Sequence, residues 1–371
     1  MLSPLTQRRK QNRRGLILLG LLALTLAGAA ATEWRYLGPL PVAIGADPDA
    51  PAALAGWPWR GAAFDRPHLG VAHWFDQSSP DGTQLDLFDF DFGANPRLRF
   101  GLYDQDEDDA QPFDDKAHPW AMGVAQAAKH LNETGRGTVL AACNGLFYDY
   151  DTTGPASTAS HVTPVVLNGV PHYAHTENHR WTFGVQDGPD GRPTFRAVHL
   201  PDAGTLARDF TFAAGGAQCL VREGQVQPLP PYAVGNSAHP AFASMKTSRV
   251  SWGWSRDSRH LYLLFVKEPD EEAVSEWAWE HHVPLDGGWS LPDEARFWHA
   301  LGVWGAVNSD AGDVAQLVYR LPDGQYEMSR RYEMSEPRWS SASVRRALSA
   351  DFSGAPPGGS LMYWYVRDVG P

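Results

Sequence analysis

The chain has 371 residues, of which 43% are hydrophobic and 20% are charged, so it is long and apolar enough for one large folded domain or two ordinary ones. Its 36 glycines and 29 prolines indicate many turns, which favours a loop-rich fold containing β-structure over a helical bundle. The formal net charge of −12 at pH 7 argues against nucleic acid as a partner.

Residues 1–31 have the pattern of a targeting segment. An uncharged apolar stretch covers residues 15–31, and Ala29-Ala30-Ala31 at its end fits a cleavage site for a signal peptide. A cleaved signal peptide and an uncleaved membrane anchor at residues 15–31 are both compatible with this length. The basic residues before the stretch keep the N-terminus in the cytoplasm, so we expect an exported protein, periplasmic or extracellular; they are Arg8, Arg9, Lys10, Arg13 and Arg14.

Residues 32–65 are rich in Pro, Ala and Gly and are interpreted as a lead-in to a main domain at residues 66–371. Residues 70–75 and 85–92 predict a β-hairpin, because the second segment mostly alternates apolar with acidic residues. A helix is predicted from Pro119 to its stop at Gly135.

Three groups of residues raise the question of a metal or a disulfide. The acidic run 104–109 has the oxygen chemistry that suits calcium, but it lacks the features of an EF-hand, and a solvated acidic loop is the alternative. His175, Glu177 and His179 lack an evident fourth zinc ligand and are interpreted as a polar loop. Cys143 and Cys219 form either a disulfide or two buried thiols. We therefore expect no cofactor and no metal in a functional site, with a divalent cation as an alternative that no motif supports.

The rest of the chain combines strands with two further helices. Ser290 and Gly302 bound one predicted helix, and a last helix is predicted from Ser341 to Ala350. The predicted strands are at residues 138–143, 162–167, 181–185, 210–214, 219–221, 246–254, 261–266, 303–307 and 361–366. These elements predict an α/β fold of the α+β type, with mixed, largely antiparallel sheets, packed helices and a single main domain.

The segment from Lys246 to Gln316 gathers small and polar residues where apolar runs begin or stop. Arg249 opens one run, and Asn308 to Gly312 follows another. Sites are often built at such places, because a rigid element orients the side chains of the adjoining loop.

The order of motifs along the chain resembles the phosphodiester glycosidase family over roughly residues 66–335. The matching motifs are Asn144-Gly145-Leu146-Phe147, Gly215-Gly216 before Cys219-Leu220-Val221, Thr247-Ser248-Arg249, and Asn308-Ser309-Asp310-Ala311-Gly312. The family typically has Asn-Gly-Gly-Phe-Phe at the first motif and Asn-Leu-Asp-Gly-Gly-Gly-Ser at the last. Leu146, Ser309 and Ala311 therefore depart from its pattern, and Ala311 in place of glycine predicts a changed backbone angle.

The resemblance implies hydrolysis of a glycosidic or sugar 1-phosphodiester bond in envelope or extracellular carbohydrate. Asp310 would be the acid or base, because burial at a strand end raises a carboxyl pKa; the alternative is a turn cap. Arg249 would hold the anionic group of the substrate; the alternative is a structural ion pair. Substrate contacts would come from the remaining matched residues, Asn144, Gly145, Asn308 and Gly312, although each asparagine could instead only satisfy a strand end.

The altered 309–311 segment favours a rival hypothesis from another class. In it, the chain is a non-catalytic carbohydrate-binding or envelope-assembly protein on the same scaffold. A secreted inhibitor that binds another protein is a third possibility, with no motif behind it. We expect the partners to be a carbohydrate or sugar phosphate, and a membrane if residues 15–31 stay uncleaved.

Overall fold

The computed structural model describes most of the chain after residue 62. The described ranges are 63–76, 83–117, 122–151, 158–173, 181–189, 191–199, 202–229, 232–234, 237–239, 243–268, 287–328 and 360–370. All of them belong to one compact unit, Ala43–Pro371. The predicted targeting segment, most of the predicted lead-in and the predicted helix at Ser341–Ala350 lie outside these ranges. None of the described helices is long and apolar enough to span a bilayer.

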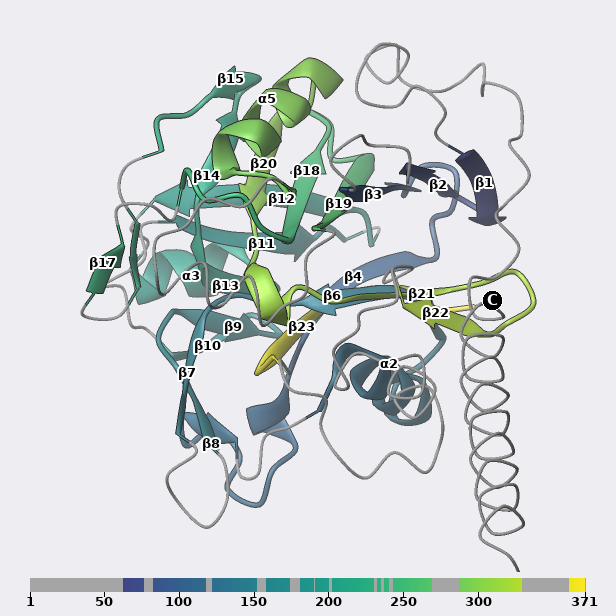
Figure 1. The fold of residues 1–371 in the computed structure, drawn as a ribbon. Coiled ribbons are helices and arrows are strands. Elements are labelled where there is room, and N and C mark those ends of the chain that lie inside the picture. Colours follow the sequence, from purple (N-terminus) through teal and green to yellow (C-terminus); the bar gives the residue numbers. More distant parts are fainter. Residues whose placement is uncertain are drawn as a thin grey trace, which may run out of the picture. The chain divides into compact units, whose positions relative to one another are not determined.

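Antiparallel sheets form most of the structure (Figure 1). The largest has eight strands, in the order β1 (Ala63–His68), β2 (Val71–Asp76), β3 (Gln84–Asp91), β19 (His260–Lys267), β18 (Arg249–Trp254), β20 (Gly305–Asn308), β14 (Cys219–Arg222) and β15 (Gln225–Val226). A five-stranded sheet has the order β10 (Val170–Tyr173), β9 (Val165–Leu167), β13 (Phe212–Ala217), β11 (Trp181–Asp187) and β12 (Pro193–His199). A second one has the order β22 (Tyr326–Met328), β21 (Leu317–Arg320), β6 (Thr138–Asn144), β23 (Met362–Asp368) and β4 (Leu98–Asp104).

Smaller sheets and a few helices complete the described fold. One small sheet has the order β5 (Lys116–Ala117), β8 (Thr158–His161) and β7 (Tyr148–Asp151), and another pairs β16 (Tyr232–Val234) with β17 (Ser237–His239). The described helices are α2 (Val124–Thr134), α3 (Ala203–Asp209) and α5 (Leu291–Leu301), with the 3-10 turns η2 (Gln105–Glu107) and η3 (Gly312–Val314).

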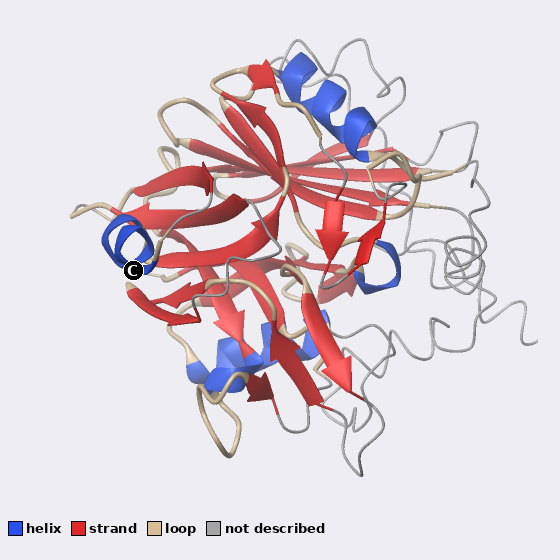
Figure 2. Ribbon diagram, turned by 90° about the vertical axis from the view of Figure 1, so that its left-hand side faces the viewer, coloured by secondary structure: helices blue, strands red, loops and turns tan. Residues whose placement is uncertain are grey.

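The predicted α/β fold of the α+β type is wrong, because the protein is mostly β. Strands account for 50% of the described residues and helices for 15%. Figure 2 shows the strands filling the molecule while the helices lie at its periphery. Every pairing between the described strands is antiparallel. The error arose because short strands such as β5, β7 and β15 are too brief to show a period-2 pattern, whereas each helix gives a clear signal.

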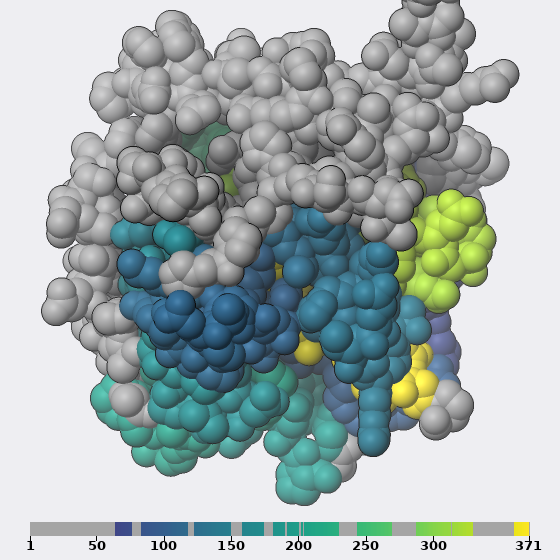
Figure 3. Space-filling view, turned by 90° about the horizontal axis from the view of Figure 1, so that it is seen from below, coloured from purple at the N-terminus to yellow at the C-terminus, as the bar shows by residue number. Residues whose placement is uncertain are grey.

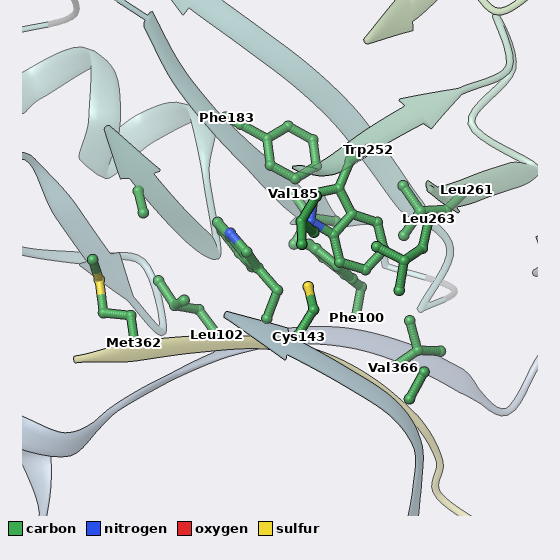
Figure 4. Packing of buried hydrophobic residues seen from close by; sticks show 14 of the residues in the cluster. Phe100, Leu102, Cys143, Phe183, Val185, Trp252, Leu261, Leu263, Met362 and Val366 are labelled. Carbon is green, nitrogen blue, oxygen red and sulfur yellow. The ribbon is translucent and has the colours of Figure 1, made fainter. Parts of the chain in front are cut away.

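The three large sheets share one hydrophobic core. Phe100 on β4 packs edge-on against Trp252 on β18 and stacks on Trp364 on β23, with ring centroids 5.1 and 5.0 Å apart. Phe183 on β11 brings the third sheet into the same cluster (Figure 4). Burial of such aromatic residues is worth several kcal/mol each, about 1.5–3 for a phenylalanine. The abundant tryptophans therefore serve the core in large part: Trp74, Trp252, Trp254, Trp298 and Trp364 are all buried.

Two helices cover outer faces of these sheets. The apolar face of α2 packs on β6, β21 and β23. Helix α5 packs against β14 and β20 and buries Phe297 and Trp298. It begins as predicted, because Ser290 and Asp293 form a capping box, and it ends at Gly302, which has the left-handed φ of 77°. The predicted hairpin is also confirmed, since β2 pairs with β3.

Both cysteines are buried free thiols, so the disulfide alternative is not realised among the described residues. The Cys143 side chain belongs to the shared core and lies near Phe100 in the close-up (Figure 4). Burial raises the pKa of Cys143 well above its usual value and that of Cys219 to about 12. Neither thiol is therefore activated as a nucleophile.

A buried histidine joins the first three strands of the eight-stranded sheet. The imidazole of His73 lies 2.8 Å from Asp86 through Nε2 and 3.4 Å from Asp65 through Nδ1, and it stacks on Phe88. Burial lowers the pKa of His73, but the two carboxylates outweigh it, so the pKa is raised above 6.5. Its charged form therefore stabilises the fold at low pH.

We expect this contribution to be complete below the unfolded-state pKa of about 6.5 and to be lost as the pH rises through the higher folded-state pKa. Urea unfolding of the wild type and His73→Gln across this pH range tests the expectation. The difference in unfolding free energy should shrink as the pH rises. His260, whose pKa is also raised, is present in both proteins and cancels in the comparison. Parallel stability curves would show that His73 is neutral throughout.

Candidate functional site

Ends of strands from two different sheets meet at the candidate site. Strand β6 ends at Asn144 in a five-stranded sheet, and β20 ends at Asn308 in the eight-stranded sheet. Arg249 opens β18, the neighbour of β20, and Ser251 on β18 lies opposite Asn308. The structure therefore brings the end of β6 together with segments that follow it by more than a hundred positions in the sequence.

Ser309 joins these segments through hydrogen bonds. Its hydroxyl lies 2.6 Å from the carbonyl oxygen of Gly145 and 3.1 Å from that of Asn144, and its backbone N–H donates to the carbonyl of Val250 at 2.7 Å. The residue is 1% exposed. The serine that departs from the family pattern thus supplies a contact between β6 and β20 that a leucine could not make.

Asn144 holds the backbone on either side of the site. Its Nδ2 donates to the carbonyl of Asp310 at 3.1 Å, and its Oδ1 accepts from the N–H of Gln316 at 3.0 Å. The side chain is fully buried. These are the bonds expected of an amide that satisfies a strand end.

Asn308 acts in the same way from the other sheet. Its Oδ1 accepts from the N–H of Gln218 at 2.5 Å, and its Nδ2 donates to the carbonyl of Ser309 at 3.0 Å. The two asparagines therefore position the main chain around Asp310. Their expected contacts with sugar hydroxyls stay a prediction.

Asp310 is the most exposed member of this group. It is 8% exposed, whereas Asn144, Asn308 and Ser309 are 1% exposed or less. Its backbone N–H donates to the carbonyl of Gly145 at 3.2 Å, and its Oδ1 accepts from the N–H of Ala311 at 2.9 Å. Asp310 is thus fixed through its backbone and side chain, which is the preorganisation that a reacting group needs.

The structure favours glycine at both candidate positions, through close packing at Gly145 and through the backbone angle at Gly312. A Cβ at Gly145 would lie 2.8 Å from both the Cβ and the carbonyl oxygen of Met362. Gly312 has a φ of 71°, in the left-handed region, and its N–H donates to the carbonyl of Ser248 at 3.0 Å. Ala311 has φ −137° and ψ −178°, an extended backbone open to any residue. An alanine fits this conformation without strain, and a change of angle relative to the family's glycine stays a prediction.

Arg249 is buried within electrostatic reach of Asp310 and already has protein partners. Its Nε donates to the carbonyl of Trp289 at 3.0 Å and its Nη2 to that of Met245 at 2.7 Å. Burial lowers the pKa of Arg249, while the charges of Glu294, Glu268 and other nearby acids raise it. The arginine thus ties the start of β18 to the segment that enters α5, and it carries positive charge among buried carboxylates.

Glu294 is a functional candidate that the sequence did not reveal. It lies in the first turn of α5, where an acidic residue usually faces water and favours the helix dipole, yet it is fully buried. Burial raises the pKa of Glu294 to about 7, against the opposing effects of Arg249 and the Ser251 hydroxyl. No pattern in the sequence distinguishes this acid from an exposed helix-start residue.

A second buried ionic group lies beside Arg249. The Ser248 hydroxyl lies 3.2 Å from a carboxylate oxygen of Glu268 and 3.4 Å from Nζ of Lys267. Both charged residues are buried. Buried charges of this kind are retained only when they are paired, so the start of β18 carries an unusual concentration of compensated charge.

His161 lies in another part of the fold. His161 is buried against Asp104, with 2.9 Å between Nε2 and Oδ2, at the end of β4. His175, Glu177 and His179 lie outside the described residues. The one grouping of three potential metal ligands that the described part of the chain contains is acidic: Asp106, Asp109 and Asp114.

No protein-family model matches the chain, and no curated protein matches it in sequence. Its fold is similar to that of the catalytic domain of zebrafish N-acetylglucosamine-1-phosphodiester α-N-acetylglucosaminidase, a structure auto-inhibited by its pro-peptide. The TM-score is 0.51 at 15% sequence identity, over 82% of this chain and 84% of that one. At this identity the comparison shows a shared fold.

Two further structures are more distant. A hypothetical protein from Synechocystis has a TM-score of 0.38 at 13% identity, over 81% of this chain and 64% of that one. A protein from Burkholderia pseudomallei, described as exported, has a TM-score of 0.44 at 12% identity, over 80% and 74%. The fold assignment therefore depends on the zebrafish structure.

Proposed function

We propose that this protein hydrolyses a glycosidic or sugar 1-phosphodiester bond in envelope or extracellular carbohydrate. The observation that carries the proposal is the convergence of the segments at Asn144, Arg249 and Asn308 around one carboxylate, that of Asp310. The shared fold with an enzyme whose name specifies a sugar 1-phosphodiester substrate supports this choice of bond.

In the proposed reaction Asp310 transfers the proton. Cleavage of a glycosidic bond needs an acid at the leaving oxygen or a base that activates water, and a carboxyl group can do either. Of the other carboxylates that act on Arg249, Glu268 and Glu294 are completely buried, and Asp293 is engaged in the capping box of α5. We therefore assign the proton transfer to Asp310.

The other candidate residues have supporting roles in this proposal. Asn144 and Asn308 hold the main chain at residues 145 and 310, and Gly312 permits the left-handed turn that follows. Arg249 supplies positive charge near Asp310 for the anionic group of the substrate. Because Nε and Nη2 of Arg249 donate to backbone carbonyls, a direct bond to the substrate would need the guanidinium to use another donor.

The location follows from the N-terminal segment and is part of the proposal. Export through residues 1–31 would place the protein in the periplasm or outside the cell, with a membrane attachment if residues 15–31 stay uncleaved. Carbohydrate of the envelope is then the available substrate class. The net charge of −12 favours an uncharged or weakly anionic ligand over a polyanion such as nucleic acid.

A non-catalytic carbohydrate-binding role is the second candidate. It is favoured by the hydrogen bonding of Asn144 and Asn308, whose amides are both directed to the backbone. Such a protein would keep the arrangement of the strand ends at Asn144 and Asn308 but would not cleave the carbohydrate that it binds.

An assay of free sugar released from N-acetylglucosamine 1-phosphodiesters, and from the 1-phosphodiesters of other sugars, separates the two functions. Turnover by the purified wild type would support the hydrolase. Saturable glycan binding without turnover would support the second candidate. The absence of both binding and turnover would exclude carbohydrate as the substrate or ligand.

A further inference from the structure

An acidic loop leaves the end of β4 on the side of the molecule away from the eight-stranded sheet. It passes through η2 and returns to the chain at β5. The blue atoms of this part of the chain form much of the surface seen from below (Figure 3). One carboxylate oxygen from each of Asp106, Asp109 and Asp114 lies within 4.8 Å of the other two.

Asp106 is the buried member of this cluster. It is 0% exposed, and its Oδ1 receives no hydrogen bond from the described residues. The other oxygen, Oδ2, accepts from the Tyr173 hydroxyl and from the N–H of Asp115. Burying a carboxylate oxygen without a hydrogen-bond donor costs free energy of folding. The Asp106 carboxylate, which belongs to the cluster with Asp109 and Asp114, therefore has one oxygen that a ligand could satisfy.

Two members of the cluster have no cationic partner among the described residues. No described lysine or arginine forms an ion pair with Asp106 or Asp114, and the nearby His161 is engaged with Asp104 at 2.9 Å. A bound cation would offset the mutual repulsion of the carboxylates.

We propose that Asp106, Asp109 and Asp114 bind a calcium ion. Calcium takes oxygen ligands at about 2.3–2.6 Å, so oxygens on opposite sides of the ion lie about 4.6–5.2 Å apart. Three oxygens that all lie within 4.8 Å of one another can therefore share one calcium ion. Magnesium usually keeps several of its waters and is less suited to a shell that takes three carboxylates from the protein. Backbone carbonyls and water complete the calcium shell.

The ion would brace a part of the fold that adjoins the candidate functional site. It would link η2 to the residues that enter β5, and β5 pairs with β8, which pairs with β7. Strand β7 begins at Tyr148, shortly after Asn144 and Gly145. Calcium should therefore raise the thermal stability of the protein, whether or not the protein is an enzyme.

Calorimetric titration of the calcium-free, full-length protein tests the proposal. We expect one calcium ion per chain, with a Kd of about 10⁻⁵–10⁻³ M and weaker binding of magnesium. Asp114→Asn removes one ligand charge at an exposed position and should weaken calcium binding by about tenfold or more. Asp106→Asn should do the same, but its burial risks a folding defect.

Asp323→Asn is the matched control, because Asp323 is an exposed turn residue between β21 and β22. Unchanged binding in this variant, with weakened binding in Asp114→Asn, would support the site. The proposal is overturned by the absence of binding up to about 10 mM calcium, by equal affinity for magnesium, or by an Asp114→Asn variant that binds as the wild type does.

Discussion

Replacing Asp310 with Asn is expected to lower kcat/KM for a sugar 1-phosphodiester by about 10²–10⁴-fold, which is the usual contribution of a positioned acid or base. The substitution removes the titratable proton and keeps the shape of the side chain. The amide oxygen can still accept from the N–H of Ala311, which lies 2.9 Å from Oδ1 in the wild type. We therefore expect the unfolding midpoint to change little.

The control for this prediction is Asp257→Asn, which neutralises a carboxylate in the exposed turn between β18 and β19. It should leave kcat/KM within about twofold, since surface substitutions rarely affect distant sites. Equal rates for wild type and Asp310→Asn would remove Asp310 from the chemistry. A matched loss in the control would point to a nonspecific charge effect instead.

Replacing Arg249 with Met should destabilise the protein by about 3–5 kcal/mol, because it leaves buried carboxylates without their counter-charge. Arg249 is 1% exposed, and the charges that act on it come first from Glu294 and then from Glu268 and Asp310. Arg259→Met is the matched control. That arginine is 52% exposed in its ion pair with Asp91, so its loss should cost less than about 1 kcal/mol.

A double-mutant cycle shows whether the cost comes from the pairing with Glu294. Glu294→Gln neutralises the buried acid, so the Arg249→Met/Glu294→Gln protein should recover part of the loss. Additive effects, or a cost below about 1 kcal/mol for Arg249→Met, would contradict the assignment.

Arg249→Lys keeps the charge without the planar fork. A rise in KM with stability retained would then indicate contact between Arg249 and an anionic substrate.

Local elements of the fold were predictable because their signals are short-range. The start of α5 follows from Ser290 and Asp293, and its end follows from Gly302. The alternation in β3 gave the hairpin with β2. The strands that end at Asn144 and Asn308 were also placed correctly, because a buried apolar run stops there.

Long-range features of the candidate site could not be read from the sequence. The hydroxyl of Ser309 contacts the carbonyls of residues 144 and 145, and no motif near Ser309 in the sequence predicts that contact. The burial of Glu294 depends on how α5 packs against β14 and β20. The fold class was also missed because a shared core among three sheets arises from strand order, which the sequence pattern leaves undetermined.

A crystal structure of Asp310→Asn with a bound sugar 1-phosphodiester tests the central claim most directly. The variant slows turnover while keeping the shape of the site, so an intact ligand can be seen. We predict that the bridging oxygen of the ligand lies within hydrogen-bond distance of the side chain at position 310, with the strand ends at Asn144 and Asn308 around it. A ligand bound elsewhere on the protein, with residue 310 untouched, would contradict the account.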